Sequence, residues 1–198
     1  MWCSVRDIDR APEALVSLNL LSLVVATSVR YSRRALADLA ERDPLTGVGN
    51  RRALNAGAGI ALQRRIAGTP AAMLLLDIDH FKAVNDTYGH AVGDRILVEL
   101  TGVITATVRA SDDVFRYGGE ELLVLANGAT TQAAAQLAET LRKRIEEYTF
   151  DQSLGITVSI SVAEAEPEDT LTSWFASVDA MLYQAKHDGR NQVRVHEQ

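Results

Sequence analysis

The chain has 198 residues, of which 47% are hydrophobic and 23% are charged. This composition is enough for one folded domain with a short extension, and it excludes a disordered chain. The formal net charge is -6 and no block rich in Lys and Arg is present, which argues against a protein that binds nucleic acid through a basic stripe. The single cysteine, Cys3, excludes an internal disulfide and fits a reducing compartment.

Residues 1–42 are expected to form an extension that is helical from Pro12 onward. No signal peptide is expected, because charged residues precede the apolar run 14–29 and no convincing cleavage site follows it. The run is shorter than the roughly 20 residues of a membrane-spanning helix, although the arginines after it suit a cytoplasmic flank. Apolar residues at heptad positions favour a dimerising stalk instead: Leu15, Leu18, Val25, Val29, Leu36 and Leu39. The end of a membrane helix, or a helix packed on its own domain, stays open.

The folded domain is predicted to span 43–198, because Asp43-Pro44 interrupts the helical pattern. A helix over 51–65 and a strand over 71–78, buried on both faces, are expected first. The later elements are a helix over 91–108, a β-hairpin over 113–126, a helix over 134–148, a strand over 156–163 with one polar face, a helix from 171 that ends before Gly189, and a short strand over 192–196. The pattern predicts an α/β (α+β) fold with a mainly antiparallel sheet flanked by helices.

Two carboxylates, Asp77 and Asp79, end the buried strand. Alternation along a strand starts both side chains on one face, where a divalent cation could offset the cost of burying them. A polar strand end that enters a turn is the alternative interpretation.

A polar segment punctuated by glycine follows at 81–94. Asp94 could accept hydrogen bonds from a guanine ring, and the amide of Asn85 could donate one to it. The alternative is an ordinary loop, with Asp94 placed in the first turn of a helix where the macrodipole favours a carboxylate.

Gly118 and Gly119 occupy the turn of the expected hairpin, and Glu120 and Glu121 follow at once. Two glycines allow a tight turn and let the backbone approach a ligand closely. Solvated charges beside a turn are the plain alternative, and the two interpretations are compatible.

Five motifs, in this order and spacing, resemble the GGDEF family of diguanylate cyclases over residues 43 to about 195. They are Asp43-Pro44-Leu45-Thr46-Gly47 with Asn50-Arg51-Arg52, Asp77 to Lys82, Asn85 to His90 with Gly93-Asp94, Gly118 to Leu122, and Tyr183 to Lys186 with Gly189-Arg190-Asn191. Departures from the family pattern are mild. Leu122 replaces the usual Phe, and Ser161 stands where Gly is common.

The resemblance implies that the domain condenses two GTP molecules into cyclic di-GMP. It implies that Mg²⁺, or Mn²⁺, is held by Asp77, the carbonyl of Ile78, Glu120 and Glu121. Glu120 would also help to deprotonate the attacking 3′-hydroxyl. The implied substrate-binding positions are Asn85 and Asp94 for guanine with His90 beside them, Gly118 and Gly119 under the nucleotide, Lys82, Lys186 and Arg190 at the phosphates, and Phe81.

Arg109 and Asp112 form an RxxD motif before the hairpin turn. In this family the motif implies an inhibitory site for the product, and Arg offers a bidentate fork for phosphate or guanine. An incidental surface ion pair is the alternative.

The resemblance also implies a homodimer, because one reaction needs two GTP-loaded halves. The lone cysteine favours a cytoplasmic protein, and the net charge favours one that does not bind nucleic acid. Attachment at the inner face of a bacterial inner membrane is left open, as is the input signal. Two rival functions remain. One is a catalytically silent module that senses cyclic di-GMP or GTP, and the other is an enzyme that makes adenine-containing or mixed cyclic dinucleotides.

Overall fold

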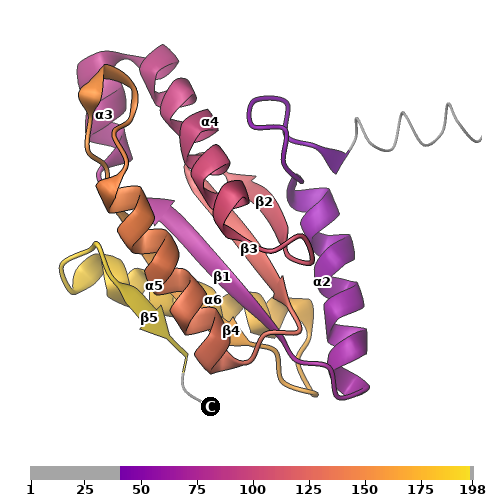
Figure 1. Cartoon of the computed structure of the whole chain (residues 1–198). Helices are drawn as coiled ribbons and strands as arrows, with labels where there is room; N and C mark the ends of the chain where they lie inside the picture. The colour runs from indigo at the N-terminus through magenta and orange to yellow at the C-terminus, as the bar shows by residue number, and fades with distance from the viewer. Residues whose placement is uncertain (1–40, 197–198) are drawn as a thin grey trace, which may run out of the picture. The chain divides into compact units, whose positions relative to one another are not determined.

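The computed structural model describes residues 41–196 (Figure 1). The predicted helical extension lies outside these residues, except for its last two. Among residues 41–196, no helix combines the length and the hydropathy that crossing a membrane requires.

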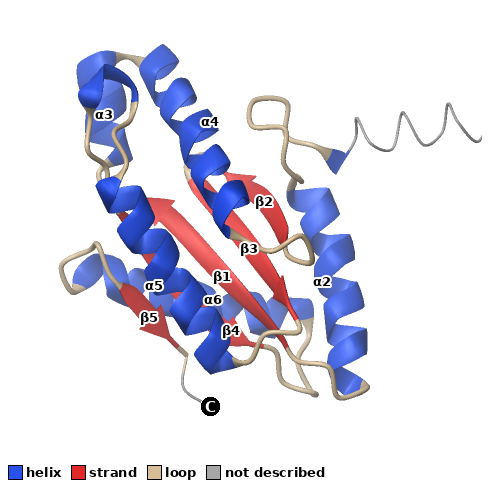
Figure 2. Cartoon of the chain, in the orientation of Figure 1, coloured by secondary structure: helices blue, strands red, loops and turns tan. Residues whose placement is uncertain are grey.

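The described strands form one mixed, mainly antiparallel sheet of five strands (Figure 2). They are β1 (Ala71–Ile78), β2 (Asp113–Gly118), β3 (Glu121–Asn127), β4 (Val158–Glu164) and β5 (Val193–Val195). The order across the sheet is β2-β3-β1-β4-β5. All neighbours are antiparallel except β4 and β5, which run parallel. The predicted α+β class and sheet type are confirmed.

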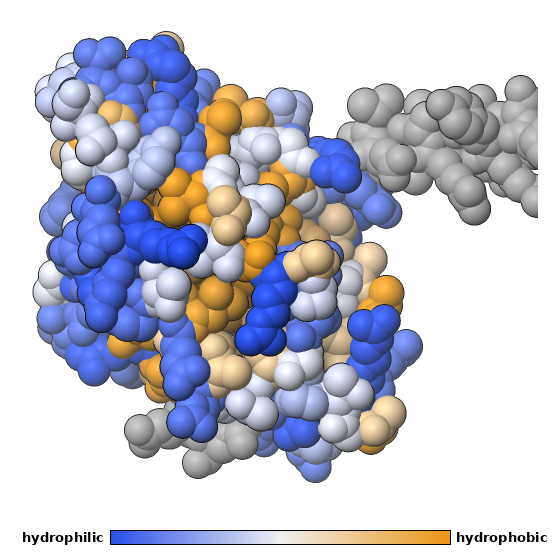
Figure 3. Space-filling model, viewed as in Figure 1, coloured by the Kyte–Doolittle hydropathy of each residue, from blue (hydrophilic) through white to orange (hydrophobic). Residues whose placement is uncertain are grey.

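Helices cover both faces of this sheet (Figure 1). They are α2 (Arg51–Ile66), α3 (Phe81–Tyr88), α4 (His90–Thr107), α5 (Thr131–Glu147) and α6 (Leu171–His187). Successive side chains of β1 alternate between two apolar clusters, one against α4 and α5 and the other against α2 and α6. Because both faces of β1 are buried, its sequence is a continuous apolar run. The outer surfaces of the helices carry most of the hydrophilic side chains on the face shown in Figure 3.

The predicted polar face of the 156–163 strand is wrong. Ser159 and Ser161 are fully buried within β4. Their hydroxyls are satisfied inside the protein, since Ser159 donates to Asp79 and Ser161 donates to the carbonyl of Leu75. A hydroxyl with an internal partner can be buried at little cost, so alternation of Ser with apolar residues did not mark a solvent face.

The alternative of an ordinary loop for the segment after β1 is also wrong, because Phe81–Tyr88 forms α3. Phe81 and Val84 are one helical turn apart, and they pack on the apolar cluster under α4. The predicted end of the last helix is confirmed, since α6 stops at His187 and Gly189 adopts a φ of +114°.

Candidate active site

The candidate site lies where the end of β1 meets the turn of the β2–β3 hairpin. The sheet register places Asp77 opposite Glu121 on β3, and opposite Ser159 on β4. Gly118 pairs with Glu121 across the hairpin. The turn residues between them, including Glu120, are therefore held next to the last residues of β1.

Asp77 is a buried carboxylate with a cation beside it. Its residue is 5% exposed, and Nζ of Lys186 lies 2.7 Å from its Oδ2. Burial is the main cause that raises the pKa of Asp77; together with the charge of Asp79, it outweighs the lowering by Lys186 and Arg190. A buried carboxylate whose charge is not fully balanced attracts further positive charge.

Glu120 and Glu121 add two partly buried carboxylates to this region. Burial is the main cause of the raised pKa of each, and repulsion from Asp77 raises both further. Asp179 on α6 also raises the pKa of Glu121, a proximity that could not be predicted from the sequence. Like charges gathered in a partly buried site are a common feature of cation-binding and catalytic sites.

The chemistry of these donors fits a hard divalent cation. All are oxygens, from carboxylates and from the Ile78 main chain, which Mg²⁺ and Mn²⁺ prefer. Within residues 41–196, no three acidic, His or Cys side chains lie close enough together to hold a metal ion as they stand. The ammonium of Lys186 instead supplies the positive charge beside Asp77.

The candidate purine residues lie on α3 and α4, which pack against each other. Asn85 is half-buried on α3, while His90 and Asp94 are exposed in the first turns of α4. The side-chain oxygen of Asn85 lies directly against Gly93, the residue before Asp94. The structure therefore brings Asn85 to the start of α4, close to Asp94.

For GTP, the substrate that the sequence resemblance implies, we predict that Gly93→Ala raises KM about 10-fold. A Cβ at this position would fall on the Asn85 oxygen and displace that side chain. Gly102→Ala is the matched control, since its Cβ would meet nothing within 4 Å in the same helix. Steady-state kinetics of both variants make the comparison. An equal KM for the two variants would show that GTP binding does not depend on the position of the Asn85 side chain.

Phe81 and Lys82 begin α3 but face different surroundings. The Phe81 ring is 5% exposed and belongs to the apolar cluster beneath α4. Its buried ring can support the segment that carries Asn85, but it offers almost no surface to a ligand. Lys82 is exposed, as a residue that contacts phosphate must be.

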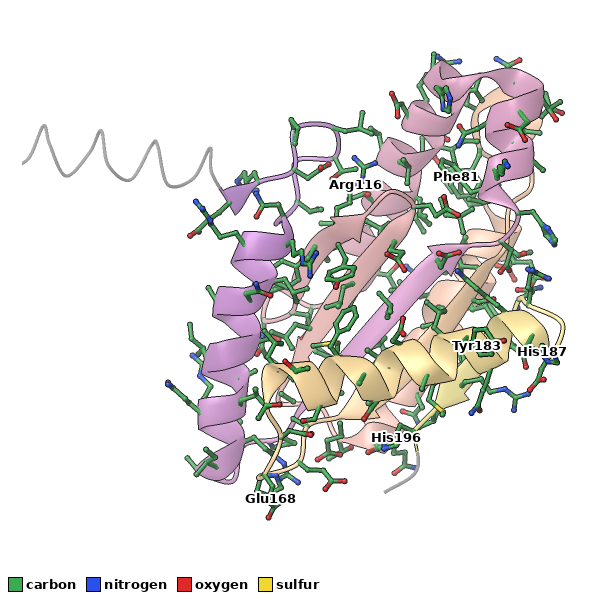
Figure 4. The ribbon with its side chains drawn as sticks, turned by 180° about the vertical axis from the view of Figure 1, so that it is seen from behind. Phe81, Arg116, Glu168, Tyr183, His187 and His196 are labelled. Atoms are coloured by element: carbon green, nitrogen blue, oxygen red, sulfur yellow. The ribbon has the colours of Figure 1, made fainter. Side chains whose placement is uncertain are left out.

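Arg116 holds the hairpin turn, a role that the sequence did not reveal. Its Nε and Nη2 donate to the carbonyl of Gly119 at 3.2 and 2.8 Å. Its Nη1 donates to both carboxylate oxygens of Asp43, at 3.2 and 3.3 Å. Figure 4 shows Arg116 at the tip of the hairpin, beside the loop that leads into α2. Arg116 therefore links Gly119, the residue before Glu120, to Asp43 at the start of the domain.

Asp43 should make this part of the domain sensitive to acid. Burial would raise the pKa of Asp43, but hydrogen bonds from Thr46 and Arg116 outweigh it and hold the pKa below its usual value. A depressed folded pKa stabilises the protein above the unfolded pKa, near 4, and this contribution is lost as the pH falls through the folded pKa. We expect Asp43→Asn to lower the free energy of unfolding at pH 7 and to do so much less at pH 3.

Urea unfolding at the two pH values measures this difference. The exposed Glu168→Gln is the matched control, and its effect should be small at both. If Asp43→Asn lowered the free energy of unfolding by the same amount at pH 3 as at pH 7, the ionised carboxylate would not be the stabilising group.

The RxxD motif forms a compact turn at the end of α4. The carboxylate of Asp112 accepts from the main-chain N–H of Arg109 at 3.1 Å, and the N–H of Asp112 donates back to the Arg109 carbonyl at 2.9 Å. The Arg109 side chain is exposed and makes no hydrogen bond or ion pair with any other residue in 41–196. The fork is therefore available to an external anion.

The chain matches known proteins over most of its length. The family profile "Diguanylate cyclase, GGDEF domain" matches residues 40–192. Diguanylate cyclase VdcA of Vibrio cholerae is 39% identical over 157 residues, covering 76% of this chain and 45% of that protein. Diguanylate cyclase DgcM of Escherichia coli is 37% identical over 168 residues, covering 84% of this chain and 41% of that protein. This chain spans less than half the length of these relatives.

Solved structures give the same result. The coiled coil and GGDEF domain of DgcB from Caulobacter crescentus, in complex with c-di-GMP, superposes with a TM-score of 0.81 at 28% identity, covering 92% of this chain and 99% of that one. The active GGEEF domain of a diguanylate cyclase from Vibrio cholerae gives a TM-score of 0.69 at 31% identity, covering 75% and 97%. With the profile match across most of its length, the chain belongs to the GGDEF family of diguanylate cyclase domains.

Proposed function

We propose that this chain is a diguanylate cyclase, which condenses two GTP molecules into cyclic di-GMP and two pyrophosphates. Each 3′-hydroxyl oxygen forms a bond to the α-phosphorus of the other GTP, and the bond from that phosphorus to the β-phosphate bridge breaks. The observation that carries the proposal is that Asp77, at the end of the central strand, lies opposite Glu121 and pairs with Lys186 at 2.7 Å. Glu120 is near enough to Asp77 for the two charges to repel. A module that only bound the product would have no need of these buried carboxylates.

Different residues would bind the guanine and the phosphates of GTP. Asn85 and Asp94 would hydrogen-bond guanine, with His90 beside them. Lys186, Arg190 and the exposed Lys82 would offset the triphosphate charge, which explains how an acidic protein can bind GTP. Gly118 and Gly119 would let the hairpin pass close to the nucleotide.

The residues at the end of β1 and at the hairpin turn would carry out the chemistry. Asp77, the Ile78 carbonyl, Glu120 and Glu121 would hold Mg²⁺ or Mn²⁺, whose chemistry is to neutralise the triphosphate and to lower the pKa of the attacking hydroxyl. Glu120 would accept the proton of the 3′-hydroxyl. Burial raises the pKa of Glu120, which makes its carboxylate a better base at neutral pH.

One site of this kind holds one GTP, so two subunits must face each other to close the cyclic product. The homodimer is therefore part of the proposal. Arg109 and Asp112 would bind the product at a separate surface and inhibit further turnover, because the free Arg109 fork suits a phosphate or a guanine. The protein would act in the cytoplasm. Any attachment to the inner face of the bacterial inner membrane would be through the N-terminal extension.

Incubation of the purified chain with GTP and Mg²⁺, followed by chromatography with mass detection, tests the proposal. We expect cyclic di-GMP and pyrophosphate in a ratio of one to two, and no product after chelation of the metal. ATP in place of GTP is the matched control and should give no cyclic dinucleotide. A folded, dimeric sample that binds cyclic di-GMP but converts no GTP would instead identify a sensing module.

A further inference from the structure

We propose that Asp79 is a positioning residue that locks the turn after α6, so that Arg190 faces the nucleotide phosphates. The role of Arg190 in this inference rests on the proposed function, whereas the lock itself does not. Asp79 lies just beyond the end of β1, two residues after Asp77, and is 6% exposed. A buried carboxylate needs donors or a cation, and within residues 41–196 Asp79 is held by hydrogen-bond donors.

Three hydrogen bonds satisfy this carboxylate. Ser159 Oγ donates to Oδ1 at 2.7 Å, and Thr157 Oγ1 donates to Oδ2 at 2.7 Å. The third donor is the main-chain N–H of Asn191, 3.0 Å from Oδ2 and 112 residues away in sequence. Because both oxygens are engaged, Asp79 is directed away from a role beside Asp77 and toward the turn at 188–191.

The turn needs this support because two of its residues adopt unfavourable backbone angles. Arg190 and Asn191 have φ values of +63° and +43°, in the left-handed region where residues other than glycine are strained. Such a conformation persists only where surrounding contacts fix it. The Asp79 carboxylate fixes the Asn191 main chain, while Arg142 and Glu146 of α5 hold its side-chain amide, each at 2.8 Å.

The locked turn places a positive charge at the candidate active site. The main-chain N–H of Arg190 donates to the carbonyl of Ala185 at 3.0 Å. The residue after Ala185 is Lys186, whose ammonium lies 2.7 Å from Asp77. The turn thus follows directly from the end of α6, where Figure 4 shows His187. Fixing Asn191 fixes the direction of Arg190, the preceding residue.

The experiment measures the affinity for a GTP analogue that cannot be cyclised, together with steady-state kinetics. We expect Asp79→Ala to weaken binding and raise KM about 10-fold, while kcat changes much less. In an Arg190→Ala background the same substitution should have almost no further effect, whereas with Asn85→Ala the two effects should add. Independent effects of Asp79→Ala and Arg190→Ala would overturn the proposal.

Two variants separate positioning from charge and from general packing. Asp79→Asn can keep all three hydrogen bonds, because its oxygen can accept from Asn191 and Thr157 while its amide donates to Ser159. It should bind the analogue within about threefold of the parent, and an affinity as weak as that of Asp79→Ala would overturn the proposal. Ser159→Ala removes a hydrogen bond from the same carboxylate but leaves the one to Asn191, so its KM should stay near that of the parent.

Amide hydrogen exchange of Asn191 tests the lock without nucleotide. We expect fast exchange in Asp79→Ala and protection in Asp79→Asn and the parent. If Asp79→Ala does not fold, Asp79→Ser serves in its place, since its shorter side chain cannot reach all three donors. A parent chain that bound no GTP analogue would refute the proposed function, and the exchange of Asn191 would still decide whether Asp79 holds the turn.

Discussion

Glu120→Gln is expected to reduce turnover by about 100- to 10,000-fold, with the fold intact. The amide keeps the shape of the side chain, but it cannot accept the proton of the 3′-hydroxyl and is a weaker cation ligand than a carboxylate. Burial and the charge of Asp77 both destabilise the ionised form of Glu120 in the free protein, and they therefore raise its pKa. Removing that charge should therefore leave the melting temperature unchanged or slightly higher, as expected for a site that sacrifices stability for function.

The measurement is the initial rate of cyclic di-GMP formation at saturating GTP and Mg²⁺, alongside thermal unfolding. Glu168→Gln is the matched control, because Glu168 is exposed and makes no ion pair with a residue in 41–196. It should match the parent in both measurements. A Glu120→Gln protein that cyclises GTP at the parent rate would show that the assignment of Glu120 is mistaken.

Much of the fold could be predicted because its signals are local. The apolar run of β1, the double glycine of the hairpin and the helical spacing in α4 each occur within a few residues. The motif order then placed Asp77 and Glu120 in one site, although 43 residues of chain separate them. The sheet register supplies the physical reason, since β1 and β3 pair with Asp77 opposite Glu121.

What the sequence could not reveal depends on contacts between distant residues. The spacing of Asp77 and Asp79 suggested a shared face and a shared cation. The structure gives them different partners, since Asp77 pairs with Lys186 while Asp79 accepts from Thr157, Ser159 and Asn191. Alternation applies only within a strand, and Asp79 lies beyond the end of β1.

The segment of α3 illustrates a second limit. Its polar residues, followed by Gly89 and Gly93, resemble a loop, and its apolar residues are too few to mark a helix by themselves. Only the packing of Phe81 beneath Gly93 shows why it folds as a helix against α4. Tertiary contacts decided the structure where the local preference was weak.

Arg109→Ala should weaken inhibition by cyclic di-GMP about 100-fold and leave the initial rate unchanged. The guanidinium is exposed and unpaired within residues 41–196, while Asp112 is already committed to the Arg109 main chain. The turn is therefore preformed, and within residues 41–196 the Arg109 side chain has no hydrogen bond or ion pair to break when it binds a ligand. Two charged hydrogen bonds from one fork are worth about 3 kcal/mol, which corresponds to a factor of about 100.

Initial rates at increasing concentrations of added cyclic di-GMP give the inhibition constant of each variant. Arg64→Ala serves as the matched control, because Arg64 is an exposed arginine on α2 outside the motif. Its inhibition constant should equal that of the parent. Inhibition of Arg109→Ala at the parent concentration would place the inhibitory site elsewhere, or in the active site itself. Relief of inhibition without loss of rate would instead mean that product binding and GTP turnover use separate surfaces. The structure is consistent with this result, because the RxxD turn follows α4 whereas the carboxylates lie where β1 meets the hairpin.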